Sequence, residues 1–133
     1  MLRTWIALID RALGIPHERG TALRVLAISV ESKVLGHMSR LVALAAVGHS
    51  DIALVRSIIV SVRKDWLLAN IEPLVVPLLD QGTGEEYRRI AELYEQIDPV
   101  LLQSHLARCA AHHDEEVREI AYDYTTSPVG SDA

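Results

Sequence analysis

The 133-residue chain has no phenylalanine, and aromatic residues make up only 5% of it, so any buried core must be mainly aliphatic. Its single cysteine, Cys109, cannot form a disulfide within the chain, and we therefore expect a reducing, cytoplasmic environment. No apolar run approaches the roughly 20 residues that a membrane-spanning helix needs. Five prolines and seven glycines argue against a low-complexity chain.

Positive charge is scarce in the second half of the chain. Residues 1–66 carry nine Lys and Arg against five acids, a balance of +4, whereas residues 67–133 carry four Arg against thirteen acids, a balance of −9. The net charge of −5 argues against a general nucleic-acid binder. The asymmetry favours head-to-tail contacts or an oriented partner, or it reflects two differently solvated faces.

The chain contains an internal repeat marked by four arginines, which follow one another at steps of 32, 32 and 30 residues: Arg24, Arg56, Arg88 and Arg118. The positions one before and two, three and six after each arginine hold only apolar residues or tyrosine. These offsets fall on one face of a helix. The sixteen residues are Leu23, Leu26, Ala27, Val30, Val55, Ile58, Ile59, Val62, Tyr87, Ile90, Ala91, Tyr94, Val117, Ile120, Ala121 and Tyr124.

A further helix is predicted before each of these, over residues 2–13, 33–47, 65–79 and 99–111. Their predicted inward residues are Trp5, Ile6, Leu8, Ile9, Leu13, Val34, Leu35, Met38, Leu41, Val42, Ala45, Leu102, Leu106 and Cys109. Predicted helix ends are residues 14–16, Gly48 and Gly82, and predicted N-caps are Ser32, Ser50, Asp65, Thr83 and Asp98. Pro73 and Pro77 predict that the third of these helices kinks or begins again near Pro73.

Two amphipathic helices cannot bury their apolar stripes alone, but stacked pairs can. The sequence therefore predicts an all-α fold, a right-handed α-α superhelix of about four helical hairpins. We expect one domain over residues 1–126, with hairpins at about 2–31, 32–64, 65–97 and 98–126, and a flexible tail over residues 127–133.

The units resemble HEAT repeats, whose second helix opens with an acidic turn and a Val-Arg pair followed by apolar residues. Residues 114–121, DEEVREIA, match this pattern well, and residues 85–91 and 51–56 are similar. The resemblance implies a HEAT-like solenoid that serves as a protein-binding scaffold. HEAT repeats often hold an Asp about six residues before the Arg for a polar ladder, but here these positions are Glu18, Ser50, Gly82 and His112.

Two further offsets of the second helices, one and four residues after each repeat arginine, are predicted to face outward. Apart from Ser57 they are apolar in the first two hairpins, and they are polar or mixed in the last two. The apolar ones need a cover, either neighbouring repeats, a second copy of the chain or a protein partner. The predicted partner-binding residues are Val25, Ile28, Ser57, Val60, Arg89 and Glu92. The four repeat arginines are predicted to be structural, anchoring each hairpin to neighbouring turns, with an acidic partner as the alternative.

Nothing in the sequence carries the pattern of a hydrolase or a nucleotide-binding loop, so we predict a non-catalytic module without cofactor or metal. The densest group of potential metal ligands runs from His112 to Glu116, and His17 adjoins Glu18, but loop solvation explains both equally well. His105 and Cys109 fall on an apolar stripe and are interpreted as core residues.

The alternative function is that of a HEAT-like DNA-binding protein or DNA glycosylase-type enzyme. Such an enzyme needs aromatic side chains and a carboxylate to hold a damaged base, and the neighbours Asp65 and Trp66, with Trp5 elsewhere, are the candidates. Clustered cations for phosphate contacts are found only in the first half of the chain, which counts against this alternative. A third possibility is that the chain is one subunit of a larger assembly.

Overall fold

In the computed structural model, the described residues, 2–126 with side chains from residue 4, contain helices and no strands. The all-α prediction is therefore confirmed. The tail predicted over residues 127–133 lies outside the described residues. The helices are α1 (Leu2–Leu13), α2 (Pro16–Ala27), α3 (Glu31–Leu35), α4 (Met38–Ala45), α5 (Ile52–Val60), α6 (Lys64–Asp80), α7 (Gly84–Ile97), α8 (Pro99–Ala110) and α9 (Glu115–Thr126).

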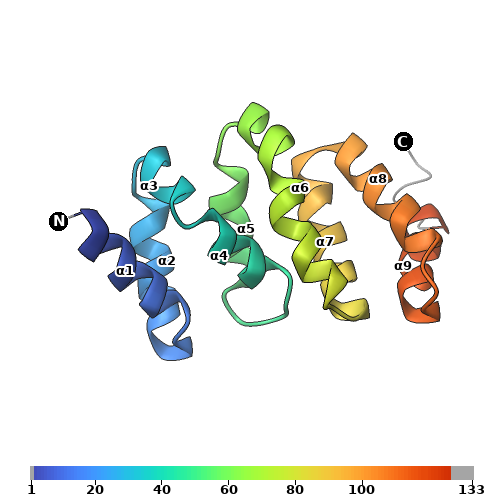
Figure 1. Cartoon of the computed structure of the whole chain (residues 1–133), viewed down its shortest axis with the longest axis horizontal. Helices are drawn as coiled ribbons and strands as arrows, with labels where there is room; N and C mark the ends of the chain where they lie inside the picture. Colours follow the sequence, from blue (N-terminus) through green and yellow to red (C-terminus); the bar gives the residue numbers. More distant parts are fainter. Residues whose placement is uncertain (1, 127–133) are drawn as a thin grey trace.

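The helices form a row along the long axis of the molecule, from α1 and α2 at the N-terminal end to α8 and α9 at the other (Figure 1). Consecutive helices pack as pairs, namely α1 with α2, α4 with α5, α6 with α7, and α8 with α9. The second member of each pair also packs against the second member of the next, in the order α2, α5, α7, α9. We refer to these four as the second helices; α2, α5 and α7 lie behind α1, α4 and α6 in Figure 1.

Three of the four predicted first helices are confirmed to within one residue at each end, as α1, α6 and α8. The single helix predicted over residues 33–47 is wrong, because α3 ends at Leu35 and α4 begins at Met38. His37 lies at this break and is buried, and its Nδ1 lies 2.6 Å from Asp10 Oδ1 on α1. A tertiary hydrogen bond thus holds a break that the local apolar pattern does not reveal.

Two of the five predicted N-caps are confirmed. Thr83 forms a capping box with Glu86, and Asp98 accepts hydrogen bonds from the amides of Val100 and Leu101. The other three, Ser32, Ser50 and Asp65, are wrong: the residues at those N-caps are Val30, Asp51 and Arg63. Helix α6 begins one residue before Asp65, whose carboxylate accepts a hydrogen bond from the Trp66 amide.

The restart predicted near Pro73 is wrong, because α6 runs unbroken through both Pro73 and Pro77. The two prolines lie one turn apart and are exposed, so the backbone carbonyls that lose a partner face solvent. The opposite face carries the buried stripe Leu67, Ile71, Val75 and Leu79. Burial of this stripe offsets the local cost of the prolines.

Most residues predicted to point inward are buried, and the exceptions gather at the N-terminal end. Of the sixteen repeat positions, Ala27 and Val30 are exposed because α2 stops at Ala27, and Tyr124 is half-buried. The inward placement of Leu8 is also wrong, since this side chain is 60% exposed. The first hairpin is thus less completely covered than the other three.

We expect Gly82→Ala to lower the free energy of unfolding by about 1–2 kcal/mol, because a Cβ at this position has no room. It would lie 2.6 Å from the Leu78 carbonyl oxygen and 2.8 Å from Glu86 Cβ, where the chain turns from α6 into α7. Gly36→Ala is the control, since its nearest contact would be an ordinary 3.4 Å. Urea denaturation of both variants measures the difference, and equal stabilities would contradict the steric argument.

Candidate functional site

The predicted partner-binding residues lie along the second helices, on α2, α5 and α7. Ile28, just after α2, is 88% exposed, and Val60 at the end of α5 is 36% exposed, while Val25 is half-buried. Ser57 is exposed, and its hydroxyl donates to the Leu54 carbonyl of its own helix. Tyr122 occupies the same repeat position in α9 as Ile28 and Val60 do in α2 and α5, and it is 66% exposed. The sequence interpretation did not include Tyr122 among the binding residues.

Arg89 and Glu92 are engaged with neighbouring hairpins. Glu92 accepts hydrogen bonds from Arg56 on α5 and, at 3.1 Å, from Nη1 of Arg89. The Arg89 guanidinium lies over Gly48 in the loop before α5, where a Cβ would come within 3.1 Å of it. These two side chains therefore stabilise the contact between the second and third hairpins, and only their exposed edges could meet a partner.

The four repeat arginines lie in different surroundings. Arg56 donates to Glu92 of the next second helix, and Arg88 Nη2 donates to Asp123 at 3.0 Å in the same way. Arg118 Nη1 donates to the carbonyls of His112 and His113 in the loop before α9, at 2.9 and 2.7 Å. Arg24 is exposed, and the position in α5 that would match Glu92 is Val60.

Ion pairs join each hairpin to the next, a feature that sequence reasoning missed. The first junction has Arg19–Asp51 (3.1 Å), the second has Arg56–Glu92 and Glu31–Arg63 (2.9 Å), and the third has Arg88–Asp123 (3.0 Å), Lys64–Asp98 (3.1 Å) and Glu72–Arg108 (3.8 Å). The residues six positions before the repeat arginines, Glu18, Ser50, Gly82 and His112, take no part in these pairs. The usable signal is an opposite charge about one repeat length further along the chain.

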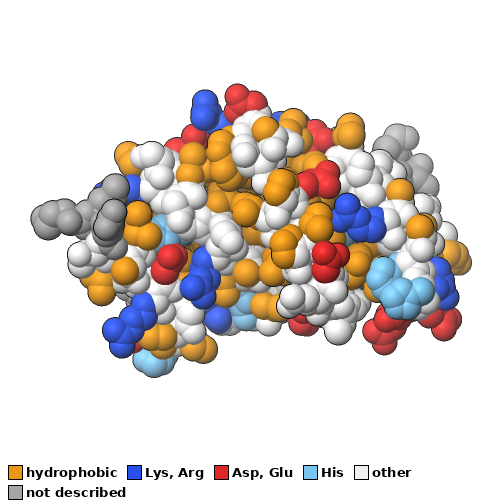
Figure 2. All heavy atoms as spheres, in the orientation of Figure 1, with side chains coloured by type: hydrophobic (Ala, Val, Ile, Leu, Met, Phe, Trp, Pro, Cys, Tyr) orange, Lys and Arg blue, Asp and Glu red, His pale blue; other side chains and the backbone are white. Residues whose placement is uncertain are grey.

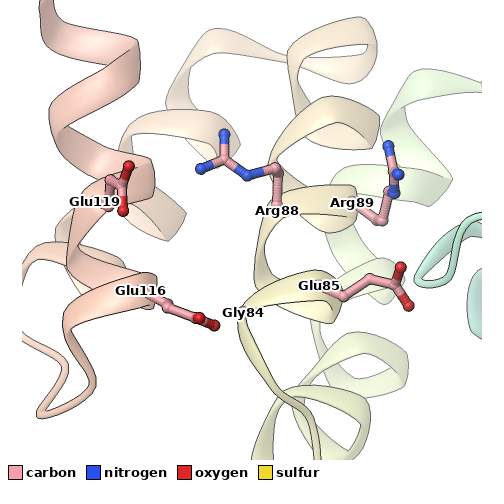
Figure 3. A pocket seen from close by; sticks show the side chains of 6 residues that line it. All are labelled: Gly84, Glu85, Arg88, Arg89, Glu116 and Glu119. Carbon is pink, nitrogen blue, oxygen red and sulfur yellow. The ribbon is translucent and has the colours of Figure 1, made fainter.

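A polar cleft of about 340 Å³ lies between α7 and α9 (Figure 3). Its lining is Gly84, Glu85, Arg88, Arg89, Glu116 and Glu119. In Figure 3, Arg88 extends from α7 toward α9, where Glu119 and Glu116 lie. The lining offers carboxylates and guanidinium groups but no hydroxyl, thiol or imidazole. It can therefore form charged hydrogen bonds with a partner but supplies no nucleophile.

A thiol and an imidazole do meet in the buried core between α7 and α8. Cys109 Sγ lies 3.7 Å from His105 Nε2, and both residues are buried, as the sequence predicts. His105 Nε2 also lies 2.8 Å from the Tyr87 carbonyl, to which it must donate, so this nitrogen cannot take the thiol proton. Burial raises the pKa of the Cys109 thiol to about 11. The pair is therefore a packed core contact and not an activated nucleophile.

The remaining candidate residues are spread over the molecule. His17 Nε2 lies 3.6 Å from Glu18, and the rings of His112 and His113 stack at 4.4 Å. Within residues 4–126, no three side chains of His, Cys, Asp or Glu converge as metal ligands. Of the two tryptophans, Trp5 on α1 packs against His37, with Lys33 above its ring, whereas Trp66 lies on α6 and packs against the core. The structure does not bring Trp5 and Asp65 into one site.

The first-helix face offers a second candidate surface. Figure 2 shows hydrophobic side chains gathered over the middle of this face, where α4 and α6 lie. Leu68 on α6 is 44% exposed and Val100 on α8 is 72% exposed, and both line an apolar cleft of about 390 Å³. Unlike the second-helix surface, this cleft does not recur at one repeat position from hairpin to hairpin.

Comparisons with known proteins identify no relative: no family model, no curated protein and no solved structure matches this chain. No helix in the part of the chain that the structure describes is long and apolar enough to cross a membrane. The functional argument therefore depends on the surfaces described above.

Proposed function

We propose that the chain is a HEAT-like helical-repeat module, a right-handed superhelix of four hairpins, that binds a protein partner through its second helices. The observation that carries this proposal is the exposure of Ile28, Val60 and Tyr122, apolar or aromatic side chains at the same repeat position in three of the four hairpins. Exposed side chains of this kind at regular spacing are typical of an interaction surface. The module is non-catalytic, and it acts as a scaffold or adaptor in the cytoplasm.

The first junction lacks the ion pair that a repeat arginine forms at the second and third junctions, and this difference indicates the chemistry of the partner. At the second junction Arg56 pairs with Glu92, whereas at the first Val60 stands in the corresponding position and Arg24 forms no ion pair with the described residues. An exposed cation and an exposed apolar side chain are thus available on neighbouring helices. We infer a partner segment that offers an apolar side chain beside a carboxylate.

We expect Val60→Asp to abolish partner binding while the chain stays folded. Position 60 corresponds to Glu92 of the next hairpin, whose carboxylate pairs with the repeat arginine Arg56. A carboxylate at position 60 therefore fits the repeat pattern, and the fold tolerates it. The measurement is affinity capture from an extract of the native host, quantified by mass spectrometry, with circular dichroism to check folding. Leu68→Asp is the matched control, because Leu68 is similarly exposed on the opposite face.

The proposal requires proteins that the wild type and Leu68→Asp retain and that Val60→Asp loses. Loss of capture with Leu68→Asp alone would assign binding to the first-helix face instead. Unfolding of Val60→Asp would show that this side chain is structural and would overturn the second-helix surface. Salt-dependent binding of the pure protein to DNA would favour the DNA-binding alternative.

A further inference from the structure

The two ends of the row differ in chemistry, and the repeat register shows how. In α9, Glu116 and Glu119, two before and one after the repeat arginine, line the cleft that faces α7. In α2, the corresponding residues are Ala22 and Val25, and no hairpin precedes α2 among the described residues. At these positions α2 therefore carries two apolar residues, of which Ala22 is buried and Val25 is half-buried.

The C-terminal end is charged at the matching positions. The α7 residues that face α9 include Gly84, Glu85 and Arg88. The corresponding residues of α9 are Asp114, Glu115 and Arg118, and within the described part of the chain no hairpin follows them. The matching positions are thus charged in α9 and apolar in α2.

The exposed α1–α2 surface, which we call the N-terminal face, has both a cleft and projecting side chains. The cleft has a volume of about 350 Å³, and its floor includes the small residues Ala12, Thr21 and Ala22. Leu8 lines it from α1 and is 60% exposed. Ile28, at the C-cap of α2 and three residues after Val25, is 88% exposed. Large projecting side chains beside a cleft of small residues form a surface that can fit a copy of itself.

We propose that the N-terminal face is a homodimer interface, in which α1 and α2 pack against the same helices of a second copy of this chain. The charged α8–α9 end could not cover this apolar surface without burying Asp114 and Glu115, so head-to-tail association is disfavoured. A contact between identical faces buries apolar area on both copies. It closes after two chains and leaves the charged ends outermost.

Charge complementarity fixes the orientation of the two copies. Arg11 on α1 and Glu18 on α2 are both exposed, and both lie at the end of the hairpin where α1 turns into α2. A two-fold axis parallel to the hairpin places α1 against α2 of the second copy. Each Arg11 then meets Glu18 of the second copy, so the dimer gains two ion pairs of opposite charge.

Sedimentation velocity over a range of protein concentrations tests this inference. We expect a mass that stops at two copies, and a dissociation constant at least about 10-fold weaker for Leu8→Asp, since a buried charge replaces an apolar contact. Val100→Asp, at an equally exposed position on α8, is the control and should leave the dimer unchanged. Arg11→Glu and Glu18→Arg should each weaken the dimer by about 3-fold, and the double variant should restore it.

A strict monomer, a mass that grows beyond two copies, or a Leu8→Asp variant that still dimerises would overturn the proposal. The charge exchange is a second test should Leu8→Asp fail to fold, because both side chains are exposed and neither contributes to the core. The dimer interface and the proposed partner-binding surface share Val25 and Ile28. Leu8 belongs only to the dimer interface, and Val60 belongs only to the partner-binding surface. Val60→Asp should therefore lose the partner and keep the dimer, whereas Leu8→Asp should do the reverse, and the two proposals can fail separately.

Discussion

Glu92→Ala should lower the free energy of unfolding by about 3 kcal/mol, the largest effect we expect from any single polar side chain of the second helices. Glu92 accepts hydrogen bonds from both Arg56 and Arg89. The side chains of Arg56 and Glu92 are only 14% and 28% exposed, and Arg56 Nε is buried without a partner. Removing the carboxylate therefore leaves a mostly buried guanidinium without its counter-charge.

Urea denaturation measures this effect, and Glu119→Ala is the matched control, since this exposed carboxylate lies on the next second helix outside the ion pairs described above. We expect the control to stay within about 0.5 kcal/mol of the wild type. The double variant Arg56→Met, Glu92→Leu should recover most of the loss, because apolar side chains need no counter-charge. A single Glu92→Ala variant as stable as the wild type would show that the junction does not depend on this pair.

Stability should fall as the pH drops from 7.5 to 5, and His105 should account for part of that fall. Burial lowers the pKa of His105, with the nearby Arg108 acting in the same direction, while the Tyr87 carbonyl and Glu72 act against it. The unfolded chain binds a proton near pH 6.5, whereas the folded chain does so only at lower pH. The contribution of His105 is therefore fully present above pH 6.5 and is lost progressively below it.

Urea denaturation at several pH values, compared between the wild type and His105→Gln, isolates this contribution. Glutamine keeps a donor for the Tyr87 carbonyl but does not titrate, so the other histidines contribute equally to both curves. The wild type should lose more stability than the variant between pH 6.5 and 5. Parallel curves would mean that His105 is protonated with equal ease in the folded and unfolded chains.

The sequence predicts best those elements that depend on local chemistry. The capping box from Thr83 to Glu86 and the Asp98 cap involve residues within three positions of one another, and both are present. Likewise, α1, α6 and α8 follow from apolar stripes and their flanking glycine or proline residues. In these places, the residues that determine the structure are adjacent in the chain.

The predictions that failed depend on contacts between distant residues. The apolar stripe from Val34 to Ala45 continues across Gly36 and His37, so it does not reveal the helix break there. That break is held by a hydrogen bond between His37 and Asp10, which lie 27 residues apart in the chain. Leu8 fits the inward stripe of α1 as well as Ile9 does, yet it is 60% exposed, on a side of the hairpin that no other described hairpin covers. The sequence pattern identifies an apolar face but not whether a neighbour exists to cover it.

The sequence predicts which positions belong to the candidate site, but it does not predict which side chains surround each of them. Offsets from the repeat arginine correctly placed Ile28 and Val60 on exposed surface. The same offsets do not show that Arg89 and Glu92 bind their own neighbours, because the pairing partner Arg56 lies 36 residues from Glu92. Side chains of equal offset thus divide into those that stabilise a junction and those that remain available for binding.

The central claim, that a protein partner binds the second helices, is tested most directly by hydrogen exchange of the chain with and without its captured partner. Bound partner should slow exchange in α2 and α5, residues 16–27 and 52–60, and leave α6 and α8 unchanged. Val60→Asp should show no such slowing at the same partner concentration. Protection confined to α6 and α8 would contradict the account and assign the binding surface to the first helices.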